Sequence, residues 1–181
     1  MSERGKTRVF VAAYFREGIT SSEGSYELLQ HARFHWAIWI EPKGSTGIGA
    51  CYQAMKYDEF VNIPDSGRWQ YEYINTADYT RSASMLGRIM VGKLPKDVSP
   101  ELVADILFGG VPLPAENNDA VENCVNWTMA ALRELQLRGC VDNFDIQDFM
   151  DHALQRANSW YSNSSWRERN LKETYVQRRF P

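Results

Sequence analysis

The segment FHWAIWI (residues 34–40) decides the fold of this chain. Its aromatic and β-branched residues are typical of a β-strand, in which consecutive side chains point to opposite faces of the sheet. In that arrangement His35, Ala37 and Trp39 face one side, and the other four residues of the segment face the other. A histidine therefore stands near the start of a predicted strand.

A second strand is expected at Gly49–Met55, after a loop whose Pro and Gly residues suit a hairpin. We predict that His35 pairs with Gln53. Paired residues share a face, so the side chains of Gln53 and Cys51 would both point to the His35 side. A slip of two residues would keep that facing and place Cys51 or Met55 opposite His35.

The other predicted elements follow the order strands first, helices after. Further strands are expected at 7–15, 69–74 and 85–94, and helices at 99–109, from 118–123 to 139, and from 145 onward. The pair Ser99-Pro100 and the apolar spacing that starts at Ile146 are the clearest helix signals. This order predicts an α+β fold, an antiparallel sheet with packed helices.

The length of 181 residues, with 44% apolar and 24% charged residues, is that of one globular domain, which we place at residues 1–165. Residues 166–181 hold five Lys or Arg against two Asp or Glu and are expected to form a solvated basic tail, with folding back onto the acidic body or binding of a partner as the alternatives. The net charge of -3 argues against a dedicated nucleic-acid binder. No apolar run approaches the ~18–20 residues of a membrane span.

The three cysteines, Cys51, Cys124 and Cys140, form no CxxC pair. The apolar stretch Val9–Phe15 is too short for a secretory signal, so we expect free thiols in a reducing, cytoplasmic compartment. No two histidines or cysteines lie at metal-ligand spacing, and we expect neither a metal nor a cofactor. The GxSxG, SxxK, P-loop, HExxH and GxGxxG signatures are absent.

A candidate nucleophile lies in the segment ENCVNWTMAAL (residues 122–132), which opens a predicted helix. At that position the thiol of Cys124 would lie near partly positive backbone N–H groups, which favour the thiolate. Acidic residues just before it oppose this by like-charge repulsion, so activation would require a nearby imidazolium. The alternative is that Cys124 is a small core residue. Cys140 is a weaker candidate without a recognisable partner.

The strand with His35 and the later Asn123-Cys124 pair resemble the permuted papain-like superfamily, which includes the lecithin–retinol acyltransferase-like and PPPDE peptidase groups. In those families a histidine opens a strand, and the nucleophilic cysteine follows later at a helix N-terminus. This order is the reverse of that in ordinary papain-like proteases. The sequence is also similar to a set of fungal proteins of unknown function with a Cys-x-x-Trp helix. The resemblance covers residues 34–138.

The resemblance implies a catalytic set of Cys124, His35 and a third polar residue, for which we choose Gln53. The family commonly has histidine there, and glutamine can orient an imidazole but cannot relay a proton. The oxyanion would be held by the Cys124 backbone N–H, with the Asn123 or Tyr52 side chain as a second donor.

These residues imply a hydrolase or acyltransferase that acts on an amide, ester or thioester of a small-molecule or peptide substrate through a Cys124 acyl-enzyme. An inactive papain-like binding module is the alternative, and Gln53 and the acidic residues before Cys124 favour it. Tryptophans could line an apolar substrate pocket or belong to the core. Those expected at a pocket are Trp36, Trp39 and Trp127.

Overall fold

The computed structural model describes residues 7–24, 29–57, 68–115, 124–163 and 171–175. Within them, six strands form one open sheet in the order β4-β3-β2-β1-β5-β6. All neighbouring strands are antiparallel except β5 and β6. The strands are β1 (Arg8–Tyr14), β2 (His35–Glu41), β3 (Ile48–Tyr57), β4 (Arg68–Asp78), β5 (Met85–Lys93) and β6 (Lys172–Thr174).

Three α-helices and two short 3-10 helices accompany the sheet in the described residues. They are η1 (Gln30–Arg33), η2 (Tyr79–Arg81), α2 (Pro100–Gly110), α3 (Cys124–Leu137) and α4 (Ile146–Ser162). Local capping explains where two of them begin: Ser99 accepts from the Leu102 N–H at the start of α2, and Asp145 accepts from the Asp148 N–H at the start of α4. The α+β class predicted from the sequence is confirmed.

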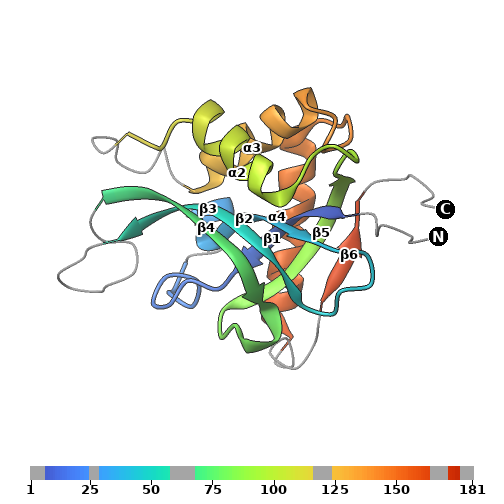
Figure 1. Cartoon of the computed structure of the whole chain (residues 1–181). Coiled ribbons are helices and arrows are strands. Elements are labelled where there is room, and N and C mark those ends of the chain that lie inside the picture. The colour runs from blue at the N-terminus through green and yellow to red at the C-terminus, as the bar shows by residue number, and fades with distance from the viewer. Residues whose placement is uncertain (1–6, 25–28, 58–67, 116–123, 164–170, 176–181) are drawn as a thin grey trace.

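All three α-helices pack on one face of the sheet (Figure 1). The main core lies between them and the alternate strand residues that face them, such as Val11, Trp36 and Tyr52. Burial of this apolar surface is the main driving force that holds the helices on the sheet. The residues at the other positions of the same strands therefore form a separate, second face.

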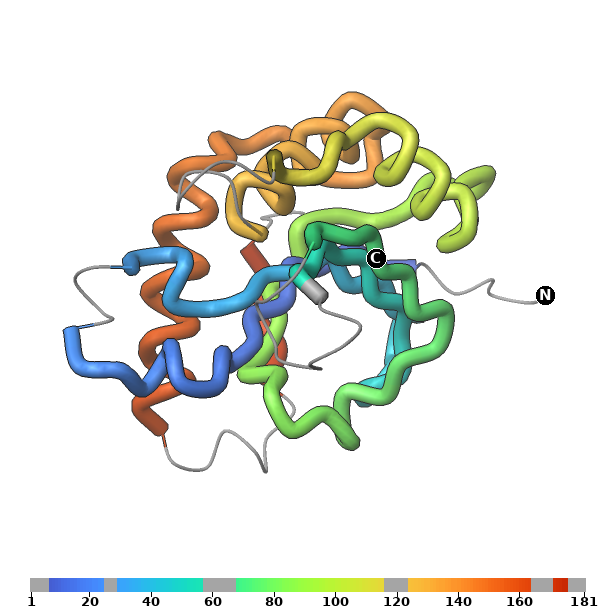
Figure 2. Tube along the Cα trace, turned by 90° about the vertical axis from the view of Figure 1, so that its left-hand side faces the viewer, coloured from blue at the N-terminus to red at the C-terminus, as the bar shows by residue number. Residues whose placement is uncertain are grey.

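The second face carries a smaller apolar cluster that includes Phe10, Trp39, Cys51 and Tyr79. The sheet is strongly curled, and Figure 2 shows β4 and the segment that leads into β5 coming round over this face. Tyr79 of η2 packs against the strands there. The curl thus covers the second face of the sheet, on which the His35 side chain lies, and no α-helix is needed there.

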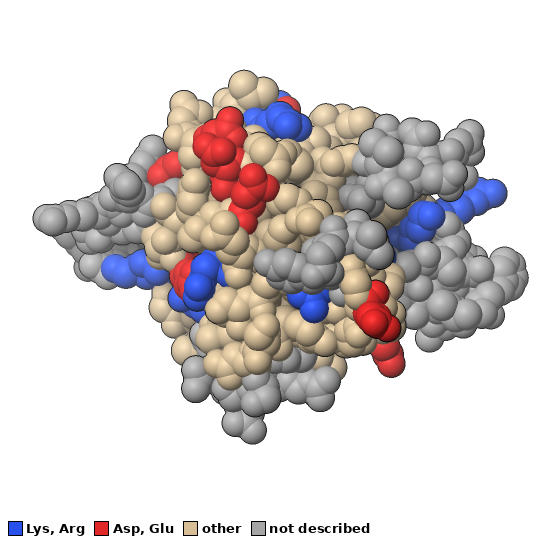
Figure 3. All heavy atoms as spheres, turned by 180° about the vertical axis from the view of Figure 1, so that it is seen from behind, with Lys and Arg blue, Asp and Glu red and all other residues tan. Residues whose placement is uncertain are grey.

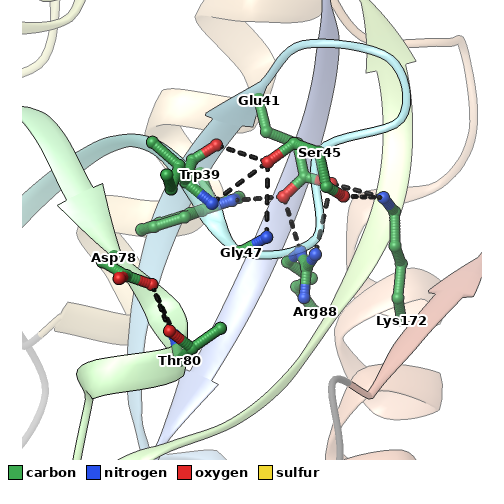
Figure 4. Close-up of polar contacts among 9 residues, drawn as sticks. Trp39, Glu41, Ser45, Gly47, Asp78, Thr80, Arg88 and Lys172 are labelled. Atoms are coloured by element: carbon green, nitrogen blue, oxygen red, sulfur yellow. Dashed lines mark hydrogen bonds and ion pairs between the residues drawn. The ribbon is translucent and has the colours of Figure 1, made fainter.

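A charge cluster built around the fully buried Glu41 and Arg88 lies on this second face (Figure 4). The Glu41 carboxylate accepts from Arg88 Nε at 2.8 Å and from Trp39 Nε1 at 2.8 Å, and it is also ion-paired with Lys172. The guanidinium of Arg88 lies 5.5 Å from the centre of the Phe10 ring on the intervening strand β1. The cluster therefore links β2, β5 and β6 across β1.

The pairing of β2 with β3 differs by two residues from the predicted register. Ile38, Trp39 and Ile40 pair with Tyr52, Cys51 and Ala50. The slipped alternative is thus the one adopted, and its continuation places Met55 opposite His35. The cause is a wider connecting loop, in which the Ser45 hydroxyl accepts from the Ile48 N–H at 3.0 Å.

Lys172–Thr174 lies within the segment expected to be a basic tail, yet it forms β6 alongside β5. Two ion pairs hold it: Lys172 with the buried Glu41, and Glu173 with Arg156 of α4 at 2.9 Å. Both depend on residues far away in the sequence. One charge of each sign from this segment is therefore paired with the body of the domain.

Removal of the Glu41 carboxylate should strongly destabilise the fold. In Glu41→Ala, Arg88 (0% exposed) loses the carboxylate with which it is paired, and breaking a buried ion pair by removing one partner costs about 3–5 kcal/mol of the free energy of unfolding. Urea denaturation measures this loss. The matched control is Glu134→Ala, which breaks a more exposed pair with Arg138 and should cost less than about 1 kcal/mol. Equal losses in the two variants would contradict the role assigned to Glu41.

Gly92 of β5 should not tolerate a side chain. A Cβ atom there would lie 2.3 Å from the carbonyl oxygen of Cys140 and 2.7 Å from Val141 Cα, both backbone atoms. We expect Gly92→Ala to lower the free energy of unfolding by roughly 3 kcal/mol, at the upper end of overpacking costs. Gly109→Ala is the control, because nothing lies within 4 Å of its Cβ position, and alanine should be neutral or stabilising in α2. Similar stability of both variants would be evidence against this packing.

Candidate active site

Cys124 is positioned by the packing of α3 against β2. The buried residues of α3 recur at helical spacing, and Cys124, the first residue of the helix, is one of them with 5% of its surface exposed. One turn later, the Thr128 hydroxyl donates to the Trp36 carbonyl at 3.4 Å. These contacts hold the Cys124 sulfur 4.0 Å from the carbonyl oxygen of Phe34, beside the start of β2.

His35 is the first residue of β2 and follows η1 directly. The Phe34 N–H donates to the His31 carbonyl, and the buried Phe34 side chain anchors the entry into the strand. On the neighbouring strand Tyr14 lies opposite His35, and the two ring centres are 5.7 Å apart. The half-buried imidazole is thus supported on one side by an aromatic ring.

Gln53 reaches His35 despite the slipped register. His35 Nε2 lies 2.7 Å from Gln53 Oε1, a distance at which the imidazole donates to the amide carbonyl. Both side chains lie on the same face, and the contact runs diagonally across the strand pair. The Gln53 amide nitrogen donates to Glu72 Oε2 and to Met55 Sδ, each at 3.2 Å.

The imidazole of His35 is also hydrogen-bonded to the Cys124 thiol. Burial is the largest single influence and raises the pKa of Cys124, but the charge of His35 and a hydrogen bond with it lower the pKa. The backbone N–H of Trp36 and the charge of Arg16 also lower it, and the net result is a pKa below the ordinary value. A thiolate at the start of a helix is further favoured by the partly positive backbone N–H groups of the first turn.

The other two thiols show the opposite behaviour. Burial raises the pKa of Cys51 to about 12, partly offset by a hydrogen bond with Tyr14, while the charge of Glu72 raises it further. The pKa of Cys140 is also raised, mainly by burial. Cys124 is therefore the most acidic of the three thiols.

The arrangement provides a base with a defined protonation pattern. Because Nε2 of His35 donates to Gln53, the other ring nitrogen, Nδ1, is left with the lone pair that can accept a proton. The thiol of Cys124 is the acid next to it. Proton transfer between them gives a thiolate–imidazolium pair, the activated form of a cysteine nucleophile.

Several predicted site residues lie elsewhere. The Tyr52 hydroxyl donates to the Pro100 carbonyl at 2.7 Å, on the helix-covered face, so it is not available as an oxyanion donor. Trp36 and Trp127 are buried in the main core, 1% and 2% exposed. Asn123 lies outside the described residues.

Trp39, in contrast, lines a cavity of about 190 Å³ on the second face. The wall of this cavity also includes Tyr14, Cys51 and Gln53, so the cavity borders a residue of the site. Apolar side chains such as Ile74 make up much of the remaining wall.

Three residues near the site were not found from the sequence. Tyr14 packs against the imidazole, Arg16 lowers the pKa of the thiol by its charge, and Glu72 accepts from Gln53. The signal for Tyr14 was its position at the end of the first predicted strand. Glu72 pairs directly with Gln53, but no turn signal fixed the register of β4.

The described part of the chain contains no group of three His, Cys, Asp or Glu side chains that could hold a metal ion. None of its helices has the length and apolarity needed to span a membrane. On the face shown in Figure 3, its Lys and Arg side chains are scattered and form no continuous basic patch.

Comparison with known proteins places the chain in a family. The model of a family of unknown function (DUF6914) matches residues 6–178. The chain belongs to DUF6914. No curated protein and no solved structure matches it. The DUF6914 match includes every strand and helix described above, so both the Cys124–His35–Gln53 cluster and β6 lie within it.

Small thiol-alkylating reagents should distinguish the three cysteines by pH. We expect Cys124 to react at a lower pH than Cys51 and Cys140, because its pKa is lowered and theirs are raised. In His35→Ala, only burial and weaker influences remain, so the pKa of Cys124 should rise and its reaction should move to higher pH. Mass spectrometry of each cysteine peptide across a pH series measures this.

His152→Ala is the control variant, because it removes an imidazole that packs against Tyr175, away from Cys124. It should leave the pH profile of Cys124 unchanged. A Cys124 profile that is the same in the wild type and in His35→Ala would refute the interaction.

Proposed function

We propose that this DUF6914 protein is a cysteine-dependent hydrolase or acyltransferase that acts on an amide, ester or thioester through an acyl-enzyme on Cys124. The observation that carries this proposal is the placement of one imidazole between two partners. His35 contacts the Gln53 carbonyl through Nε2 and is hydrogen-bonded to the Cys124 thiol. A purely structural cysteine has no need of such a base.

In the first half-reaction, His35 Nδ1 takes the thiol proton and the Cys124 sulfur attacks the acyl carbon. A C–S bond forms, and the carbonyl π electrons move to the oxygen. The backbone N–H of Cys124, at the start of α3, is the proposed donor to this oxyanion. Collapse of the tetrahedral intermediate breaks the bond to the leaving group, which receives the proton from the imidazolium.

In the second half-reaction, water or another acceptor nucleophile attacks the thioester. His35 takes the proton of this nucleophile, the new acyl bond forms, and the C–S bond breaks. The proton then returns to the sulfur of Cys124, so that the enzyme is regenerated. Gln53 keeps its hydrogen bond to the imidazole throughout and needs no proton transfer of its own.

The permuted papain-like arrangement is part of the same proposal. It is supported by the order along the chain, with the histidine strand β2 before the cysteine helix α3. It is also supported by the packing, with Cys124 at the start of a helix that lies on the sheet beside His35. The three free thiols support the accompanying proposal of a reducing, cytoplasmic location.

A binding module on an inactive scaffold is the second candidate. The observation that favours it is the burial of the thiol, since only 5% of the Cys124 surface is exposed. In that case a ligand would use the cavity next to Gln53, and the imidazole would serve only as a hydrogen-bonding group.

Turnover distinguishes the two candidates. We expect purified protein to hydrolyse members of a panel of p-nitrophenyl esters and aminocoumarin amides, and intact-mass analysis should show an acyl adduct on Cys124. Cys124→Ala should abolish adduct and turnover, because no other described thiol has a lowered pKa.

Cys140→Ala is the matched control and should retain both. Circular dichroism must show that each variant is folded. Turnover that persists in folded Cys124→Ala would rule out the proposed mechanism, and absence of any adduct on the wild type would favour the binding module.

A further inference from the structure

Gln53 is a base-orienting residue with two chemically different ends. Its carbonyl oxygen can only accept a hydrogen bond and its amide nitrogen can only donate. The amide could face His35 with either end, and the two orientations have opposite consequences for the imidazole. What fixes the orientation is therefore decisive for the site.

The amide nitrogen of Gln53 is engaged on the side away from His35. Its two hydrogens point to Glu72 Oε2 and Met55 Sδ, each at 3.2 Å. A carboxylate has acceptor oxygens only, so it selects the nitrogen end of the amide. A flipped amide would bring its oxygen against the carboxylate oxygens and lose both donor contacts.

The fold holds Glu72 in the position required for this selection. Gln53 and Glu72 are directly opposite each other in the ladder between β3 and β4, so their side chains share a face. Gln53 is 7% exposed and Glu72 is half-buried, which limits competition from water. A charge-assisted hydrogen bond at such a site is stronger than one between neutral groups.

The orientation of the amide sets the tautomer of His35. With the Gln53 carbonyl at 2.7 Å, Nε2 must carry the hydrogen, and Nδ1 keeps the lone pair and is the ring nitrogen left for the hydrogen bond with the Cys124 thiol. With the amide flipped, Nε2 would have to accept, and the hydrogen would move to Nδ1. The imidazole could then no longer take the proton of Cys124.

We propose that Glu72 is a positioning residue that fixes the Gln53 amide and, through it, holds His35 in the Nε2–H tautomer. Its importance for catalysis rests on the function proposed above, whereas its effect on the imidazole does not. Gln53, the third residue of the proposed catalytic set, therefore acts together with Glu72, which lies opposite it on β4.

Long-range ¹H–¹⁵N NMR of the full chain reads the tautomer directly. In the wild type, we expect the neutral His35 ring to carry its hydrogen on Nε2. Glu72→Lys presents donors only and should turn the amide over, which gives the Nδ1–H form. Glu72→Ala should give a mixture, and Glu72→Gln, which still offers a carbonyl oxygen, should stay close to the wild type.

Alkylation of Cys124 at pH 7 provides the second readout. We expect the rate to fall about fivefold in Glu72→Ala, the effect of losing roughly one hydrogen bond, and further in Glu72→Lys. The matched control is Glu134→Ala, which removes a carboxylate bonded to Arg138 on α3 and should change neither readout. Circular dichroism identifies the variants that remain folded.

The outcomes separate this proposal from the proposed function. An Nε2–H tautomer of His35 in folded Glu72→Lys would overturn the role of Glu72, whatever the activity. A switch to Nδ1–H in that variant would support it, even if the wild type formed no acyl adduct and the proposed catalysis were wrong. If Glu72→Lys does not fold, a wild-type tautomer in Glu72→Ala overturns the proposal equally.

Discussion

The buried carboxylate of Glu41 is the constraint on which the second face of the sheet depends. A fully buried anion is costly unless its oxygens are satisfied, and here Arg88, Lys172 and the indole N–H of Trp39 supply the donors. These donors come from three different strands, so the cluster is complete only when β2, β5 and β6 are all in place. Because it spans β1 over the Phe10 ring, it also restricts how far the sheet can flatten.

Glu41 and His35 lie at opposite ends of β2 and on the same face. The strand is thus held by charges at its end and presents the imidazole at its start, where α3 approaches from the other face. His35 and Cys124 meet around this end of the strand, so the site needs both layers of the fold. This arrangement explains why the thiol can belong to the main core while a residue of the second face lowers its pKa.

The fold class and the strands could be predicted because their signals are local. Alternation in β2, the Ser99-Pro100 pair and the apolar spacing that starts at Ile146 are all contained in short windows of sequence. The register of β2 and β3 was wrong by two residues because it depends on hydrogen bonds within the loop around Ser45. Strand β6 was missed because a short parallel strand gains its stability from distant partners, of which Glu41 and Arg156 are the charged ones.

The same distinction between local signals and long-range contacts explains which features of the site could be predicted. A two-residue slip preserves the facing of a strand, so Gln53 still reaches His35 although the predicted pairing was wrong. Strand alternation also places Tyr52 on the face opposite Gln53, which is why its hydroxyl lies with Pro100 and away from the imidazole. The identity of Gln53 alone, however, left open which end of its amide meets the ring. That choice depends on Glu72, one strand further away, and no pattern within β3 could reveal it.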